Sequence, residues 1–219
     1  MRKIIAGVFQ SLDGVMQGPG HTAEDPTGGF NLGGWNVTFW DEKMGAAMGG
    51  VFNAPYELLL GRKTYEIFAA HWPYVPEGDP IAATFNKTAK HVLSRGPDKL
   101  VWNNSHKLDG IDAVKKLKAT DGPDLLIQGS TTLYPQLFAA GLIEKLFIMT
   151  FPIILGKGKR LFGAGTPSAG LKLVGSDIST TGVVIATYEP AGNVPTGSFA
   201  PAKPSEAELE RRERMTREG

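Results

Sequence analysis

The sequence predicts one α/β domain built on a mixed, mainly parallel sheet that is flanked by helices. Apolar strand-like runs alternate with helical patterns up to about residue 140. Buried strands separated by helices are typical of parallel sheets covered on both faces. Beyond that point strands follow one another through short glycine turns at 156–158 and 181–182, which predicts antiparallel strands at one edge.

In the first half of the chain the hydrophobic pattern switches repeatedly between strand and helix. Strands are expected where short apolar runs occur, at residues 3–9, 57–60, 91–94 and 100–102. Helices are expected at residues 39–52, 63–70 and 81–87, with a glycine-rich loop at 21–35 before the first of them. This order supplies the βα units that a parallel sheet needs.

The second half begins with two more helices around a buried strand. Ile111, Val114 and Leu117 share one face of an expected amphipathic helix at 111–118. A buried strand is expected at 124–128 and a helix at 132–140, which Gly141 closes. The remaining strands are expected at residues 145–155, 172–176 and 183–189.

Composition divides the chain into a body and a tail. Residues 1–190 form the expected domain, and residues 191–204 are rich in Gly, Pro, Ser and Ala, which predicts a flexible linker. Residues 205–219 are strongly charged, and Ser205 with Glu208 forms a capping box. We expect a solvated, frayed helix there, with a partner-docking helix as the alternative.

The charge and residue counts exclude several classes of function. With 23 Lys plus Arg against 22 Asp plus Glu, the formal charge is +1, so no broad basic surface for nucleic acid is expected. There are no cysteines, and the four histidines are far apart, so we expect no metal site. The apolar runs are too short for a membrane span or an export signal, which predicts a cytoplasmic protein.

One candidate anion site follows the apolar run at 57–60. Gly61 ends the expected strand, and Arg62, Lys63 and Thr64 open the next helix. Free N–H groups and the positive end of the helix dipole favour an anion there. The pattern alone is equally compatible with a plain strand-to-helix turn whose cations are solvated.

Two further strand ends carry similar chemistry. Gly129, Ser130 and Thr131 follow the strand at 124–128, and Ser94 and Arg95 end the strand at 91–94. The hydroxyl groups suit a diphosphate, and the planar Arg95 fork suits a phosphate monoester. Simple helix capping and an exposed turn are the alternatives. Since such strand ends meet at one edge of an α/β sheet, together they suggest a dinucleotide, and Arg95 suggests NADP.

Five segments in register carry a family resemblance. They are residues 11–14, 61–66, 93–95, 127–130 and 152–162. Over residues 1–190 the chain resembles the dihydrofolate reductase-like family, in the branch similar to the reductase domain of bacterial bifunctional riboflavin-biosynthesis proteins.

The resemblance implies a mixed sheet, NADPH as cofactor and a homodimer. In the family the glycine-arginine turn and the strand ending in Ser-Arg hold the adenosine 2′-phosphate side, and the later glycine turn holds the diphosphate. The matching cofactor-binding positions here are Gly61, Arg62, Lys63, Thr64, Ser94, Arg95, Gly129, Ser130 and Thr131.

The resemblance also directs attention to two acids. True dihydrofolate reductases place an acid shortly after a tryptophan, and here the equivalents are Trp35 and Asp41, with a spacing one residue off the usual pattern. Trp40 joins Trp35 as a candidate wall for a flat substrate, and Asp13 is the second candidate catalytic acid. The alternatives are a helix-start role for Asp41, a turn role for Asp13 and a core role for the aromatic residues.

These expectations converge on an NADPH-dependent reductase of a small planar polar substrate, pterin-like or a ribosylated aminopyrimidine. The alternative is a non-catalytic NADP(H)-binding protein with the same fold. An acid within reach of the substrate distinguishes the two.

Overall fold

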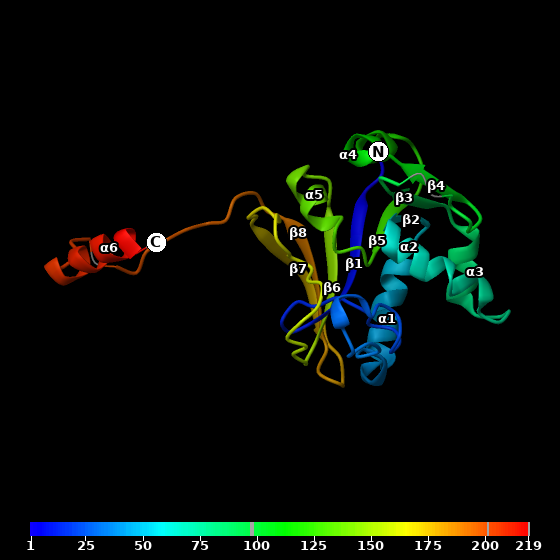
Figure 1. Cartoon of the computed structure of the whole chain (residues 1–219), viewed down its shortest axis with the longest axis horizontal. Helices are drawn as coiled ribbons and strands as arrows, with labels where there is room; N and C mark the ends of the chain where they lie inside the picture. The colour runs from blue at the N-terminus through cyan, green and yellow to red at the C-terminus, as the bar shows by residue number, and fades with distance from the viewer. Residues whose placement is uncertain (97–98, 201, 219) are drawn as a thin grey trace.

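The protein is organised around one eight-stranded sheet in a computed structural model that describes residues 1–96, 99–200 and 202–218 (Figure 1). The strands are β1 (Ile4–Ser11), β2 (Tyr56–Gly61), β3 (Lys90–Leu93), β4 (Ser105–Leu108), β5 (Asp124–Gln128), β6 (Lys145–Phe151), β7 (Leu171–Ile178) and β8 (Val184–Pro190). Their order is β4-β3-β2-β5-β1-β6-β8-β7. Neighbours from β4 to β6 are parallel, and β8 pairs antiparallel with β6 and β7. The predicted mixed sheet with antiparallel late strands is confirmed.

The helices connect the parallel strands as the sequence pattern predicts. They are α1 (Glu42–Phe52), α2 (Arg62–Ala69), α3 (Pro80–Lys87), α4 (Gly110–Ala119), α5 (Tyr134–Ala139) and α6 (Glu206–Glu218), with short 3-10 turns η1 (Thr27–Gly29), η2 (Val37–Phe39) and η3 (Trp72–Tyr74). The first helix begins at Glu42 rather than at 39, because Trp40 is extended and Asp41 caps the helix by accepting from the Met44 N–H at 2.9 Å.

Two expected strands differ from the structure. The run at 100–102 is not a strand: Trp102 is a core residue whose N–H donates to the Tyr65 hydroxyl at 2.8 Å. The edge strand is instead β4, which is polar and therefore has no apolar run to reveal it. Strand β6 ends at Phe151 rather than 155, because Pro152 has no N–H for the ladder.

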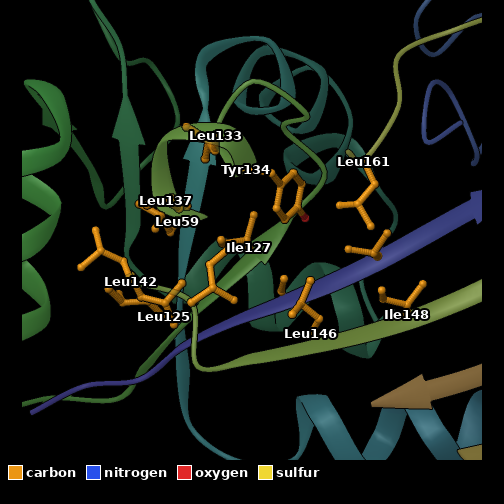
Figure 2. Close-up of a cluster of buried hydrophobic side chains, with 14 of the residues drawn as sticks. Leu59, Leu125, Ile127, Leu133, Tyr134, Leu137, Leu142, Leu146, Ile148 and Leu161 are labelled. Atoms are coloured by element: carbon orange, nitrogen blue, oxygen red, sulfur yellow. The ribbon is translucent and has the colours of Figure 1, made fainter. Parts of the chain in front are cut away.

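The central strands are buried on both faces of the sheet, and alternate residues of β2 enter different cores. Leu59 packs with α4, α5 and the centre of the sheet, whereas Leu58 and Leu60 pack against α2 and α3. Figure 2 shows Leu137 of α5 lying against Leu59 in the first of these cores. A third core joins α1 to β6 and β8. Burial on both faces explains why these strands read as continuous apolar runs.

Beyond β8 the chain leaves the sheet. Figure 1 shows α6 standing apart from the body at the end of an extended segment. No residue of α6 is buried, and Glu208 forms ion pairs within the helix with Arg211 and Arg212 at 2.6 and 2.8 Å. The beginning of the segment is bonded to the residue that precedes β7: the Ala191 N–H donates to Gly170 O, and the Gly170 N–H donates to Gly192 O. In the described chain no helix is both long and apolar enough to cross a bilayer.

We predict that deletion of residues 195–219 leaves the melting temperature unchanged within about 2 °C, because little apolar area is lost. Deletion of residues 191–219 also removes both backbone hydrogen bonds to Gly170, so it should lower the melting temperature by about 4 °C or more. Differential scanning calorimetry of the two truncations measures this. Equal melting points, or a large loss on the shorter deletion, would contradict the prediction.

Candidate functional site

The main cleft lies at the carboxyl ends of parallel strands and has a volume of about 1310 Å³. Strands β2, β3 and β5 end at its edge, where ligands of open α/β sheets bind. The structure brings every expected cofactor-binding position to this one cleft: Gly61, Arg62, Lys63, Thr64, Ser94, Arg95, Gly129, Ser130 and Thr131. Residues from three separate strand ends thus share one surface.

The Ser130 side chain joins two of these strand ends. Its Oγ accepts from the Gly61 N–H at 2.7 Å and donates to the Thr64 Oγ1 at 2.8 Å. The approach is close: a Cβ on Gly61 would lie 3.0 Å from Ser130 Oγ, and one on Gly129 would lie 3.1 Å from Thr64 Oγ1. Glycine at both positions lets the two turns meet.

The turn after β5 has an unusual backbone. Gly129 and Ser130 are consecutive residues with φ of 68° and 66°. Such a conformation is uncommon for serine and costs free energy, so it persists only where the surroundings hold it. Here the two hydrogen bonds of Ser130 hold it. The helix expected at 132–140 begins only at Tyr134, so Thr131 lies in the preceding turn.

The start of α2 offers donors and positive charge. No side chain caps the helix, so the N–H groups of its first turn are available to a ligand. Arg62 is bonded to Glu66 at 2.7 Å, and Lys63 is exposed. An anion bound here would be stabilised both by the helix dipole and by these cations.

The third strand end supplies another cation. Ser94 is buried, and its Oγ accepts from the Gly96 N–H at 3.3 Å. Arg95 is exposed and forms no ion pair with any described residue. Its guanidinium is therefore available to a ligand, and its planar fork matches a phosphate monoester.

The other end of the cleft is formed by the loop after β1 and by aromatic side chains. Trp40 lines the cleft and meets Phe9 edge to face at 5.8 Å. Asn36 and Gln17 line it as well. Of the two tryptophans expected to contact substrate, Trp35 does not line the cleft: its Nε1 donates to Gln17 O at 2.8 Å, and it packs on Phe151 in the core.

Sequence reasoning missed two acids that line this end, because nothing distinguishes them from other polar residues of a glycine-rich loop. Burial raises the pKa of Glu24, and hydrogen bonds from the Gly20 and His21 N–H groups only partly oppose it. Burial would also raise the pKa of Asp25, but its bonds to Lys159 and Thr27 lower it. Asp25 is thus held as a paired carboxylate, and Glu24 is the more easily protonated acid.

The expected acid Asp41 lies outside the cleft lining. One carboxylate oxygen accepts from the Met44 N–H, and the other accepts from the N–H and hydroxyl of Thr180 at 2.6 and 2.7 Å. The hydrogen bond from Met44, together with those from Thr180, lowers the pKa of Asp41. Asp41 thus starts α1 and ties it to the turn between β7 and β8, so its expected catalytic role has no support from this geometry.

Asp13, the second expected acid, is also outside the cleft lining. Its oxygens accept from the N–H groups of Leu155 and Gly156 at 3.0 Å, from Ser11 Oγ and from Arg160. Burial would raise the pKa of Asp13, but these hydrogen bonds outweigh it and lower the pKa to about 2. The side chain fastens the turn after β1 to the segment after β6.

Comparison with known proteins places this geometry in a family. The model of the RibD C-terminal domain matches residues 2–185. The uncharacterized protein YyaP of Bacillus subtilis (strain 168) is 25% identical over 194 residues, which cover 85% of this chain and 94% of that protein.

Solved structures agree on the fold. A candidate riboflavin biosynthesis protein from Shewanella sp. PV-4 is similar with a TM-score of 0.58 at 22% identity, covering 86% of this chain and 99% of its own. Dihydrofolate reductase from Enterococcus faecalis, complexed with NADP(H) and RAB-propyl, is similar with a TM-score of 0.54 at 15% identity, covering 86% and 96%. The expected dihydrofolate reductase-like fold is confirmed.

We predict that Asp13→Asn destabilises the protein by about 1 kcal/mol at neutral pH, a value reduced by solvent screening. Because the folded-state pKa lies below the ordinary value of 3.8, the contribution is complete above that value. It is lost as the pH falls towards 2, so the difference between variant and wild type should close in acid. Urea unfolding at decreasing pH measures it. The control is Asp112→Asn, which breaks an exposed pair with Lys115. An equal loss of unfolding free energy in both variants would refute the structural role of Asp13.

Proposed function

The chain belongs to the RibD C-terminal domain family, and from that premise we propose that it is an NADPH-dependent reductase. Its substrate would be a small planar polar molecule, pterin-like or a ribosylated aminopyrimidine. The observation that carries the proposal is the convergence of three strand ends on one cleft, with the expected cofactor-binding positions all on its surface.

The chemistry of these residues fits a dinucleotide phosphate. The N–H groups of the first turn of α2 and the hydroxyl groups of Thr64 and Thr131 are donors suited to a diphosphate, and the Ser130 hydroxyl, which donates to Thr64, holds the turn in place. Arg62, Lys63 and Arg95 add positive charge at the same end. A 2′-phosphate would find its partners among these cations, which favours NADPH over NADH.

When bound, NADPH would supply the hydride for the reduction. The residues of this chain would bind the phosphates, orient the ring and keep water from it. Phe9 of β1 and Trp40 line the same cleft, meet edge to face and offer an apolar wall to a flat acceptor.

A non-catalytic NADP(H)-binding protein is the second candidate, and one observation favours it. Neither Asp41 nor Asp13 lines the cleft, so the acids expected to assist the chemistry are engaged elsewhere. A panel of candidate acceptors, with NADPH oxidation followed by absorbance, distinguishes the candidates. Turnover of any acceptor supports the reductase, and NADPH binding without turnover supports the alternative.

The proposed assembly is a homodimer formed along the late strands. Strand β7 is the edge of the sheet, and all of its residues are exposed. Leu173, Val174 and Ile178 leave an apolar strand edge open to further pairing. Natural proteins cover or charge such edges, and a second copy of the chain would cover this one.

We predict that NADPH binds at least about tenfold more tightly than NADH, the size of one charge-assisted hydrogen bond. Arg95→Ala should weaken NADPH binding by a similar factor and leave NADH unaffected. Fluorescence titration of both cofactors measures this, with Arg217→Ala in α6 as the matched control. Equal affinities in the wild type would remove the 2′-phosphate argument.

We predict a dimer in light scattering at micromolar concentration, and a monomer for Leu173→Lys. The control is Leu209→Lys in α6, because Leu173 and Leu209 are 51% and 46% exposed. Only the change on β7 places a charge in the proposed interface. A wild-type monomer across the concentration range would overturn the assembly.

A further inference from the structure

Asn36 differs from the other polar residues at the loop end of the cleft. It lines the cleft and is 4% exposed, yet its carboxamide has no hydrogen-bond partner among the described residues. Neither carboxamide atom is sealed from the cleft, whereas the Nε2 of Gln128 is buried without a partner. A ligand that displaces water from Asn36 must pair with this amide, because leaving a buried amide unpaired costs about 1–3 kcal/mol.

Its neighbour Gln17 shows what a structural carboxamide looks like here. Gln17 Nε2 donates to the carbonyl oxygens of Asp25 and Thr27, each at 2.9 Å, and its Oε1 accepts from the Lys159 N–H at 3.1 Å. That side chain is fully used in holding the loop. Asn36 is equally buried and holds nothing with its side chain.

The backbone presents Asn36 rigidly. Its N–H donates to Pro19 O at 3.3 Å, and its carbonyl accepts from the Phe39 N–H at 3.1 Å. The preceding Trp35 is anchored in the core through Gln17. Gly33 permits the close approach of the two loop segments, since a Cβ there would lie 2.6 Å from His21 O. A carboxamide on such a support is positioned before any ligand arrives.

The charges around Asn36 argue against a phosphate at this end. Lys159 is paired with Asp25 and also donates to Thr27 Oγ1 at 2.8 Å. Glu24 adds a second acid to the same lining. The exposed cations Lys63 and Arg95 of the same cleft follow β2 and β3, not the loop after β1. An uncharged group therefore fits this end better than an anion.

We propose that Asn36 is the specificity-determining residue of the cleft and recognises the O=C–N–H edge of an uncharged planar ring that carries no phosphate at this end. A carboxamide has one donor side and one acceptor side, so it pairs with a cis-amide edge through two hydrogen bonds. Phe9 and Trp40 line the same end and can contact the ring faces. The inference rests on the proposed function, because it assigns the strand-end half of the cleft to the cofactor.

The test uses the full chain saturated with NADP⁺ and two probes, lumazine and 1,3-dimethyllumazine. The methyl groups remove the N–H donors and keep the flat shape. Titration calorimetry in mildly acidic buffer should show lumazine binding at least about tenfold more tightly. Asn36→Ala and the near-isosteric Asn36→Leu both lack the amide acceptor and donor, so each should abolish this preference.

Asn31→Ala is the matched control, because Asn31 is exposed in the same loop and does not line the cleft. It should retain the preference for lumazine. Failure of the wild type to bind lumazine, equal binding of both probes, or a preference that survives Asn36→Ala overturns the assignment. If Asn36→Ala does not fold, Asn36→Leu decides by the same criterion.

A second arm tests the absence of phosphate recognition. Uridine and uridine 5′-phosphate are titrated into the same NADP⁺-saturated protein, and the phosphate should bring no gain. Tightening by about tenfold would show a cation site at this end and overturn the proposal. A separate NADPH titration of the wild type keeps the two ideas apart. Its failure would refute the proposed reductase, whereas loss of lumazine discrimination alone refutes only the role of Asn36.

Discussion

The hydrogen bonds of the Ser130 hydroxyl are the constraint on which the cleft depends. Accepting from Gly61 N–H and donating to Thr64 Oγ1, this one side chain joins the turn after β5 to the turn after β2. The strands pair in parallel, so the sheet alone brings their ends to the same edge. The side chain fixes the spacing of the turns, and the left-handed backbone at Ser130 is the conformational cost of doing so.

Carboxylates elsewhere in the protein serve a comparable structural purpose. Asp13 fastens the turn after β1 to the segment after β6, and Asp41 joins the start of α1 to Thr180. Both acids accept several hydrogen bonds that favour the charged form, which lowers their pKa values. A catalytic acid needs a pKa nearer the working pH and access to the ligand. Glu24, whose pKa is raised by burial and which lines the cleft, satisfies these conditions better than either acid.

The fold could be predicted from the sequence where burial controls residue choice. Strand β5 was predicted at residues 124–128 and is Asp124–Gln128, because strands covered on both faces must be apolar. The edge strand β4 was not predicted, because its polar residues give no apolar run. The apolar run that ends at Trp102 was taken for a strand, although Trp102 is a core residue in a loop. The sequence also indicates the glycine and hydroxyl residues at the strand ends, and the structure brings them to one cleft, but their role in binding an anion stays a prediction. The hydrogen bonds of Asp41 could not be predicted, because its partner Thr180 is distant in sequence.

Asn36 is another residue whose role the sequence does not indicate. An asparagine next to a tryptophan in a glycine-rich loop resembles any turn residue, and its isolation becomes visible only when every neighbouring polar group has been assigned a partner. The residues that line the cleft come from two sources. The strand-end half is formed by the residues after β2 and β3, which supply helix N–H groups and the exposed cations Lys63 and Arg95. The loop half is formed by the residues after β1, which supply Glu24, the neutral Asn36, and Asp25 in a pair with Lys159. A phosphate-rich cofactor in the loop half would face Glu24 and Asp25, whereas a neutral ring in the other half would leave the cations unpaired. Charge complementarity thus favours one orientation of the proposed ligands, and in that orientation the ring of the proposed substrate would lie beside Asn36.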